Sequence, residues 1–164
     1  MKVALLMGSD SDLPRLEPCL AQLKELGIAC EARVLSAHRT PAAVIRFVEE
    51  APARGIGVIL CAAGGAAHLA GVVSAHTDLP VLGIPMDNPP LGGLDALLST
   101  VQMPGGVPVG ALGTGVGGPV NAAILAARIL ALSDPALAAR LANYRKAQTE
   151  KVLAKDRALQ AKLG

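Results

Sequence analysis

The sequence contains almost no aromatic side chains: Phe47 and Tyr144 are the only two, and tryptophan is absent. Proteins that bind single-stranded nucleic acid stack the bases on aromatic rings, and this chain has no such platform. Its formal net charge of +2 over 164 residues also provides no strong field to attract a phosphate backbone. We therefore expect no nucleic-acid partner.

Long apolar runs and paired cysteines are absent as well. No apolar run approaches the roughly 20 residues that a membrane-spanning helix needs, so we expect no membrane association. The first apolar run, at residues 3–7, is too short for a secretory signal and has no cleavage pattern, which predicts a cytoplasmic protein. Cys19, Cys30 and Cys61 show neither CxxC nor CxxH spacing, so we interpret them as small buried side chains and expect no bound metal.

Basic residues are missing from the middle of the chain. Between Gly55 and Ala127 there is no Lys or Arg, and the only acids are Asp78, Asp87 and Asp95. Solvent-exposed surface normally carries charge, so much of this stretch is predicted to lie in the core or at a subunit interface. We therefore predict an obligate homo-oligomer.

Short apolar runs alternate with segments of helical character. Val3 to Met7 is a continuous apolar run that ends at Gly8, which is typical of a strand buried on both faces of a parallel sheet. Further strands are expected at 30–35, 57–62, 80–84 and 107–112, and helices at 11–26, 41–50, 66–74, 93–101 and 120–132. Five strands with intervening helices predict a doubly wound α/β sandwich, because right-handed crossovers place helices on both faces of the sheet.

The length of 164 residues and the hydrophobic content of 52% predict one domain over residues 1–164. The α/β core is expected at 1–132 and a helical extension at 134–164. Asp134 is the expected cap of this last helix, and Pro135 its first residue. An apolar stripe follows at helical spacing: Leu137, Leu141 and Tyr144. The stripe packs either on its own subunit or on a neighbouring one, and the sequence leaves both open.

Functional residues are expected in the loops that follow the strands, because sites in open α/β sheets form at the carboxyl ends of the strands. The first of these loops reads Gly8-Ser9-Asp10-Ser11-Asp12. Its glycine, two hydroxyls and helix N-terminus suit an anion, and Asp12 suits the hydroxyls of a sugar. Taken alone, the loop is better explained as a helix cap by Ser or Asp.

The second loop is more specific and reads Ser36-Ala37-His38-Arg39-Thr40-Pro41. Arg39 offers a planar fork of donors for a phosphate at a helix N-terminus. Histidine is the side-chain type whose unperturbed pKa lies nearest neutrality, as proton transfer requires, which makes His38 the candidate acid or base. Thr40 is the expected N-cap of the next helix. Together, the serine, histidine and arginine favour a functional site over a solvated loop.

The third loop contains Gly64 and Gly65, whose backbone amides can approach a ligand closely. His68 is expected in the first turn of the following helix, where the helix dipole disfavours its protonation. We interpret it as a neutral hydrogen-bonding partner of the ligand, with a packed core histidine as the alternative. His76 has no such setting and is predicted to be structural. The Gly- and Pro-rich loops at 86–93 and 102–106 either enclose a flat uncharged heterocycle or form an interface.

The motifs resemble those of the PurE family of purine biosynthesis. They run in the family's order from Met7 to Leu132: GSDSD, SAHRTP, AGGAAHLAG, PVLGIP, GLDALLSTVQMPGGVPVGAL and NAAILAARIL. The departures are small. Ala70 stands where proline is usual, residues 115–117 lack the common lysine, and Tyr144 replaces a common tryptophan.

The resemblance implies a flavodoxin-like three-layer αβα sandwich with a central parallel sheet, an extra C-terminal helix and an octameric assembly. It also implies conversion of N5-carboxyaminoimidazole ribonucleotide (N5-CAIR) to 4-carboxyaminoimidazole ribonucleotide (CAIR), without a cofactor. The AGGAAHL loop is the version found in bacterial mutases. Family members that carboxylate aminoimidazole ribonucleotide (AIR) with free CO2 differ there. An AIR carboxylase and a non-catalytic nucleotide-binding module remain as alternatives.

Matched residue by residue, the resemblance implies that His38 is the general acid and base and that Asp12 contacts the ribose. The resemblance assigns phosphate binding to four residues: Ser9, Ser11, Ser36 and Arg39. From the third loop, Gly65 and His68 complete the expected substrate-binding set. The chain has no P-loop and no dinucleotide-binding fingerprint, in keeping with a reaction that needs neither phosphoryl transfer nor redox chemistry.

Overall fold

The structure is a computed structural model that describes residues 1–164. It contains five parallel strands in the order β2-β1-β3-β4-β5. The strands are β1 (Lys2–Met7), β2 (Cys30–Val34), β3 (Ile56–Ala63), β4 (Val81–Pro85) and β5 (Gly110–Ala111). The helices are α1 (Leu13–Glu25), α2 (Pro41–Glu50), α3 (Leu69–Ser74), α4 (Leu94–Val101), α5 (Gly117–Ala131) and α6 (Pro135–Leu163). This is the flavodoxin-like strand order, so the predicted doubly wound α/β sandwich is confirmed.

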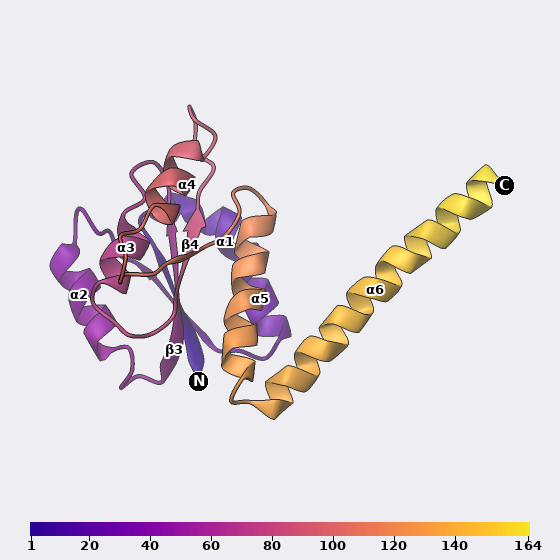
Figure 1. The fold of residues 1–164 in the computed structure, drawn as a ribbon, viewed down its shortest axis with the longest axis horizontal. Coiled ribbons are helices and arrows are strands. Elements are labelled where there is room, and N and C mark those ends of the chain that lie inside the picture. The colour runs from indigo at the N-terminus through magenta and orange to yellow at the C-terminus, as the bar shows by residue number, and fades with distance from the viewer.

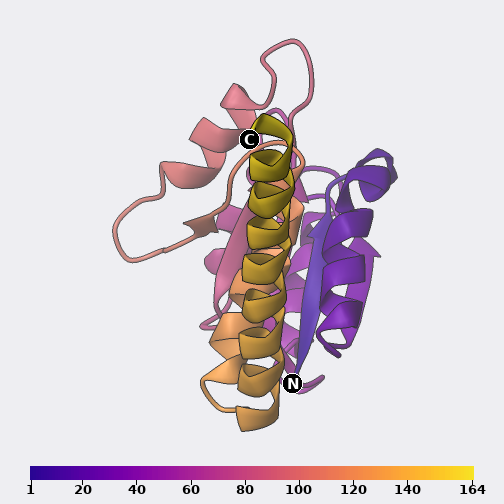
Figure 2. The same cartoon turned by 90° about the vertical axis from the view of Figure 1, so that its right-hand side faces the viewer.

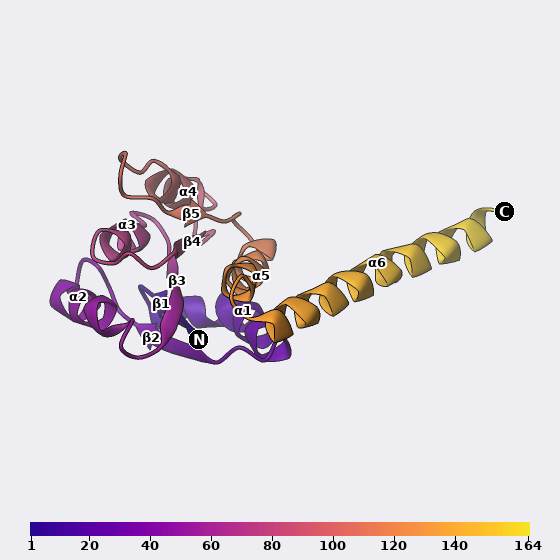
Figure 3. The ribbon, with the colours of Figure 1, turned by 60° about the horizontal axis from the view of Figure 1, so that its bottom comes forward.

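Helices cover both faces of the sheet (Figure 1 and Figure 3). Strand β1 shows why. Val3, Leu5 and Met7 belong to the core formed with α1 and α5, whereas Ala4 and Leu6 belong to the core formed with α2 and α3. Successive side chains of a strand point to opposite faces, so a continuous apolar run fills both cores.

The two edge strands are shorter or more exposed than the central ones. Strand β5 has two residues instead of the expected six at 107–112. Pro108 lies in this segment and has no N–H to donate to a strand ladder, while its carbonyl accepts a hydrogen bond from the Ser74 hydroxyl at 2.7 Å. At the other edge, residues 32–34 of β2 are exposed. Full burial on both faces is therefore limited to the central strands.

Helix α6 begins as predicted. The carboxylate of Asp134 accepts a hydrogen bond from the Leu137 amide at 2.9 Å, and Pro135 is the first helical residue. Leu137 is buried, and Leu141 and Tyr144 pack against the core of α1 and α5. The remaining residues, from 145 onward, are all exposed, and the helix runs away from the body of the protein (Figure 1 and Figure 3). Figure 2 views the protein from the side on which α6 projects. The first turns of α6 thus dock on the chain's own core.

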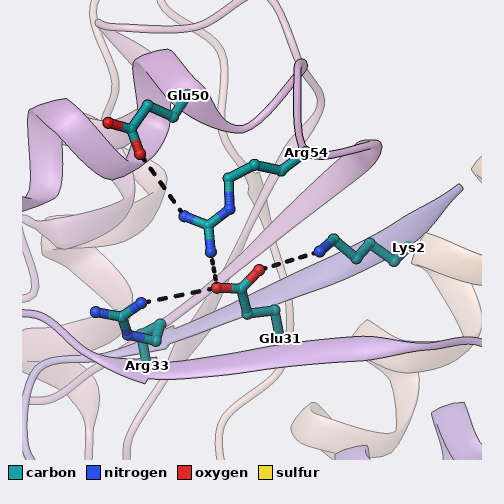
Figure 4. Close-up of polar contacts among 5 residues, drawn as sticks. All are labelled: Lys2, Glu31, Arg33, Glu50 and Arg54. Carbon is teal, nitrogen blue, oxygen red and sulfur yellow. Dashed lines mark hydrogen bonds and ion pairs between the residues drawn. The ribbon is translucent and has the colours of Figure 1, made fainter.

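A group of charged side chains lies on β2 and the segments beside it (Figure 4). Glu31 receives a hydrogen bond from Lys2 Nζ at 3.2 Å and pairs with Arg33 and Arg54. The Arg54 guanidinium also lies 4.7 Å from the centre of the Phe47 ring. Desolvation raises the pKa of Glu31, but the hydrogen bond from Lys2 and the charge of Arg54 outweigh it and hold the pKa below its ordinary value.

Glu31→Gln is expected to lower the free energy of unfolding at neutral pH. A carboxyl group with a lowered pKa in the folded state stabilises the protein above its unfolded pKa, and this contribution is lost as the pH falls through the folded value. The difference between parent and variant is therefore largest above pH 4.5, the ordinary pKa, and disappears in more acidic solution. Denaturant titrations at several pH values measure it. Glu49→Gln, on the solvent face of α2, is the control, and an equal loss in both variants would contradict the prediction.

Candidate active site

A cavity of about 370 Å³ opens at the carboxyl end of the sheet, where the loops after β1, β2, β3 and β4 meet. Strands β1 and β3 are neighbours whose following helices pack on opposite faces, which makes this the topological switch point of the fold. The residues that line the cavity are Gly8, Ser9, Ser11, Asp12, Ser36, Ala37, His38, Arg39, Ala63, Gly64, Ala66, Leu69 and Asn88.

Six of the eight predicted site residues line this cavity. They are Ser9, Ser11, Asp12, Ser36, His38 and Arg39. The other two, Gly65 and His68, do not line it. Gly65 has a left-handed φ of +62°, which turns the chain between β3 and α3, and its carbonyl accepts a hydrogen bond from Ser99. The substrate contacts expected for Gly65 and His68 stay predictions.

The first loop both caps a helical turn and faces the cavity, as its two sequence interpretations proposed separately. Ser9 caps a short 3-10 turn, Asp10–Asp12, by accepting a hydrogen bond from the Ser11 amide. The hydroxyls of Ser9 and Ser11 lie 2.8 Å apart and both face the cavity. Asp12 is only 5% exposed, and desolvation raises the pKa of its carboxyl group, against the lowering effect of the Arg15 charge. The same residues therefore cap the turn and present polar groups to a ligand.

The second loop is closed by hydrogen bonds between its own residues. The Thr40 hydroxyl donates to the Ser36 carbonyl and accepts from the Ser36 amide, both at 3.0 Å. Thr40 occupies the predicted N-cap position of α2, but its side chain bonds to Ser36 instead of to an amide of the helix. The guanidinium of Arg39 donates to the Gly8 carbonyl at 3.0 Å, which joins the first two loops and fixes the fork beside the serine hydroxyls.

The two histidines contact each other. His38 Nε2 and His68 Nδ1 are 2.8 Å apart, and the rings are nearly perpendicular at 88°. His68 is the N-cap of α3 and not a residue of its first turn, because the chain turns at Gly65 before the helix begins. A hydrogen bond needs one donor and one acceptor, so His68 Nδ1 must accept whenever His38 carries protons on both nitrogens. His68 thus holds the orientation of the His38 ring.

Sequence reasoning missed Asn88 as an individual site residue. The loop at 86–93 was expected to enclose a ligand or form an interface, but nothing in its composition singled out this amide.

The three cysteines were interpreted as small buried side chains. Cys19 and Cys61 are buried, and Cys30 is half-buried. Burial raises the pKa of Cys19 to about 12 and that of Cys30 to about 11.

No three or more His, Cys, Asp or Glu side chains come close enough together to hold a metal ion. None of the helices combines the length and the apolar character needed to cross a membrane. His76 Nδ1–H donates a hydrogen bond to the Val72 carbonyl oxygen at 2.8 Å, so the His76 ring lies against the end of α3.

The fold and the cavity define a flavodoxin-like α/β protein with a polar site at its switch point. The family model of AIR carboxylase matches residues 2–151, and the chain belongs to this family. The N5-carboxyaminoimidazole ribonucleotide mutase of Brucella melitensis is 54% identical over 150 residues, which cover 92% of this chain and 93% of that protein. The mutase of Pseudomonas aeruginosa is 50% identical over 151 residues, with coverage of 92% and 93%.

A solved structure agrees with these sequence matches. The crystal structure of a Treponema denticola PurE2 variant superposes with a TM-score of 0.88 at 30% identity, and the match covers 97% of this chain and 99% of that one. The resemblance to the PurE family is therefore confirmed.

Proposed function

We propose that this protein is the enzyme that converts N5-CAIR to CAIR in purine biosynthesis. The observation that carries the proposal is the identity of 54% and 50% to proteins named N5-carboxyaminoimidazole ribonucleotide mutase, over more than nine-tenths of the chain. The cavity supports it, because its polar residues suit a phosphorylated sugar with an ionisable group nearby. The metabolic step also supports a cytoplasmic location.

The phosphate of the nucleotide is assigned to the end of the cavity formed by the first two loops. The Ser9 and Ser11 hydroxyls, the Ser36 hydroxyl and the Arg39 fork lie there, and the bond from Arg39 to Gly8 brings the two loops together. Arginine and hydroxyl donors suit the three oxygens of a phosphate. The buried carboxylate of Asp12, in the same wall, then accepts hydrogen bonds from the ribose hydroxyls.

His38 is assigned the proton transfers. Protonation of the carbamate nitrogen of N5-CAIR breaks the N–C bond and releases CO2, which leaves AIR in the cavity. C4 of AIR then attacks the retained CO2, and the base that His38 has become removes the C4 proton. The hydrogen bond between His38 Nε2 and His68 Nδ1 holds the imidazole in place through both steps. A pocket that excludes water favours the second step, because water competes for CO2.

Direct carboxylation of AIR is the second candidate, since the matching family model describes an AIR carboxylase. The two activities differ in the compound they consume. A spectroscopic assay with purified protein, N5-CAIR or AIR plus bicarbonate, and no ATP separates them. Faster turnover of N5-CAIR is the expected result, and faster turnover of AIR plus bicarbonate would favour the carboxylase. Binding of ribonucleotide without any conversion would indicate a non-catalytic binding protein.

We propose further that eight copies of the chain assemble. An apolar stripe runs along α4 and the loop before it, with Leu91 58%, Leu94 55%, Leu98 50% and Val101 49% exposed. A groove of about 1190 Å³ lies between α5 and the first turns of α6. A contiguous exposed apolar stripe such as that on α4 marks a protein interface, and this stripe lies in the chain segment that carries no basic residue.

Leu98→Asp is expected to reduce the size of the assembly. It places a charge in the centre of the α4 stripe, where association would have to desolvate it, while the half-exposed position leaves the core intact. Light scattering at micromolar concentration should give the mass of eight chains for the parent and a smaller mass for the variant. Unchanged circular dichroism shows that the variant is folded. A parent protein that remains monomeric would contradict the proposed assembly.

A further inference from the structure

An arginine outside the predicted site holds one wall of the cavity. Arg15 lies on the exposed side of α1, and its Nη1 is 2.6 Å from Asn88 Oδ1 and 3.2 Å from Asp87 Oδ1. These bonds tie the loop between β4 and α4 to α1. Asn88 in turn lines the cavity opposite the second loop, since β1 and β3 separate β4 from β2 in the sheet. Arg15 therefore acts on the cavity through Asn88.

The bond from Arg15 decides which way the Asn88 amide faces. A guanidinium group can only donate, so the atom that receives its hydrogen bond must be the carbonyl oxygen Oδ1. The amide nitrogen Nδ2 then faces the other way and packs against Gly64. A Cβ at Gly64 would collide with this nitrogen and lie 3.0 Å from Asn88 Cγ, so only glycine leaves room for the amide. The two N–H groups of Asn88 are thus presented at the third loop.

The backbone around Asn88 is held as firmly as its side chain. The Asn88 amide donates to the Met86 carbonyl at 3.0 Å, and the Met86 amide donates to Ala63 at 2.9 Å. Pro89 follows directly and confines Asn88 to extended backbone conformations. At the far end of the loop, a Cβ on Gly93 would lie 2.8 Å from Asp87 Cα, so the loop folds tightly back on itself. The donor is in place before a ligand binds.

We propose that Asn88 is a further substrate-binding residue, whose Nδ2–H donates a hydrogen bond to the carboxylate group that the reaction moves. Arg15 is the positioning residue that sets the direction of this donor. The phosphate is assigned to the first two loops, so the imidazole end of the nucleotide extends toward the third loop and Asn88. There, a carboxylate needs donors, and the fixed amide supplies them. The inference rests on the proposed function, which supplies the carboxylated nucleotide.

Calorimetry with CAIR and with AIR tests the assignment, because the two nucleotides differ by the carboxylate. Asn88→Ala is expected to weaken the binding of CAIR on the order of tenfold and to leave the binding of AIR unchanged. Asn88→Asp replaces the donor with a charged acceptor, so it should weaken CAIR binding more than Asn88→Ala does. Lower pH should restore part of this loss as the new carboxyl group is protonated.

Variants of Arg15 and of its second partner, Asp87, complete the test. Arg15→Ala frees the Asn88 amide to rotate and should weaken CAIR binding less than Asn88→Ala does, while Arg15→Lys keeps a donor and restores part of the affinity. Asp87→Asn, which leaves the bond between Arg15 and Asn88 intact, is the matched control and should bind CAIR as the parent does.

Two results would overturn the inference: equal weakening of CAIR and AIR by Asn88→Ala, or no weakening of either. The proposed function fails separately, if the parent binds both nucleotides but does not convert N5-CAIR.

Discussion

Replacing His38 with asparagine is expected to lower the turnover of N5-CAIR by roughly 10²-fold or more, with the fold and most of the ligand binding retained. Asparagine has a similar volume and keeps a hydrogen-bonding group, but it cannot give a proton to nitrogen and later take one from C4. The side chain is exposed at the mouth of the cavity, so its loss leaves no hole in the core. Binding and chemistry should therefore separate in this variant.

The measurement combines calorimetry with single-turnover rates. His68→Asn is the comparison variant, because His68 contacts His38 and does not line the cavity. An asparagine oxygen can still accept a hydrogen bond from His38, so the turnover of His68→Asn should fall less than that of His38→Asn. Were His68 instead a direct ligand contact, as its sequence position suggested, its substitution would weaken binding at least as much as turnover. Near-parent single-turnover chemistry in His38→Asn would rule out His38 as the acid and base.

The fold was predictable wherever one local pattern determined the structure. The apolar run at 3–7 fills two cores, and it predicted a central parallel strand correctly. The cap at Asp134 and Pro135 likewise placed the start of α6. Strand β5 was overestimated because Pro108 removes a donor from the ladder and its carbonyl bonds to Ser74, a residue far away in the sequence. A contact of that kind leaves no periodic signal.

In the candidate site, too, features set by local sequence were predictable and features set by contacts between distant residues were not. The loops after β1 and β2 were recognisable because serine, histidine and arginine follow buried strands, and the sheet brings them to one cavity. The contact between His68 and His38 was not predictable. The direction of the His68 side chain depends on the turn at Gly65, and the contact also needs the second loop to approach. Asn88 was missed for a related reason: its role depends on Arg15, which the chain brings to it only through the packing of α1.

Arg39→Lys is expected to reduce kcat/KM for the nucleotide by about ten- to a hundredfold, the cost of losing one charge-assisted hydrogen bond. The guanidinium of Arg39 uses one nitrogen to donate to the Gly8 carbonyl and has further N–H groups for the phosphate. Lysine keeps the positive charge but has a single nitrogen on a flexible stem, so it cannot hold Gly8 and a phosphate in the same planar arrangement. The variant therefore tests geometry at constant charge.

The nucleoside without the 5′-phosphate is the discriminating substrate for this variant. It should be a poor substrate for the parent enzyme, because the hydroxyls of the first loop and the Arg39 fork have nothing to bind. It should also be converted at nearly the same low rate by parent and variant, since the lost hydrogen bond was made to the missing group. Values of kcat/KM for both compounds with both proteins measure the coupling between residue and phosphate. If Arg39→Lys slowed both compounds equally, the arginine would act by joining the first two loops through Gly8 and not by binding phosphate.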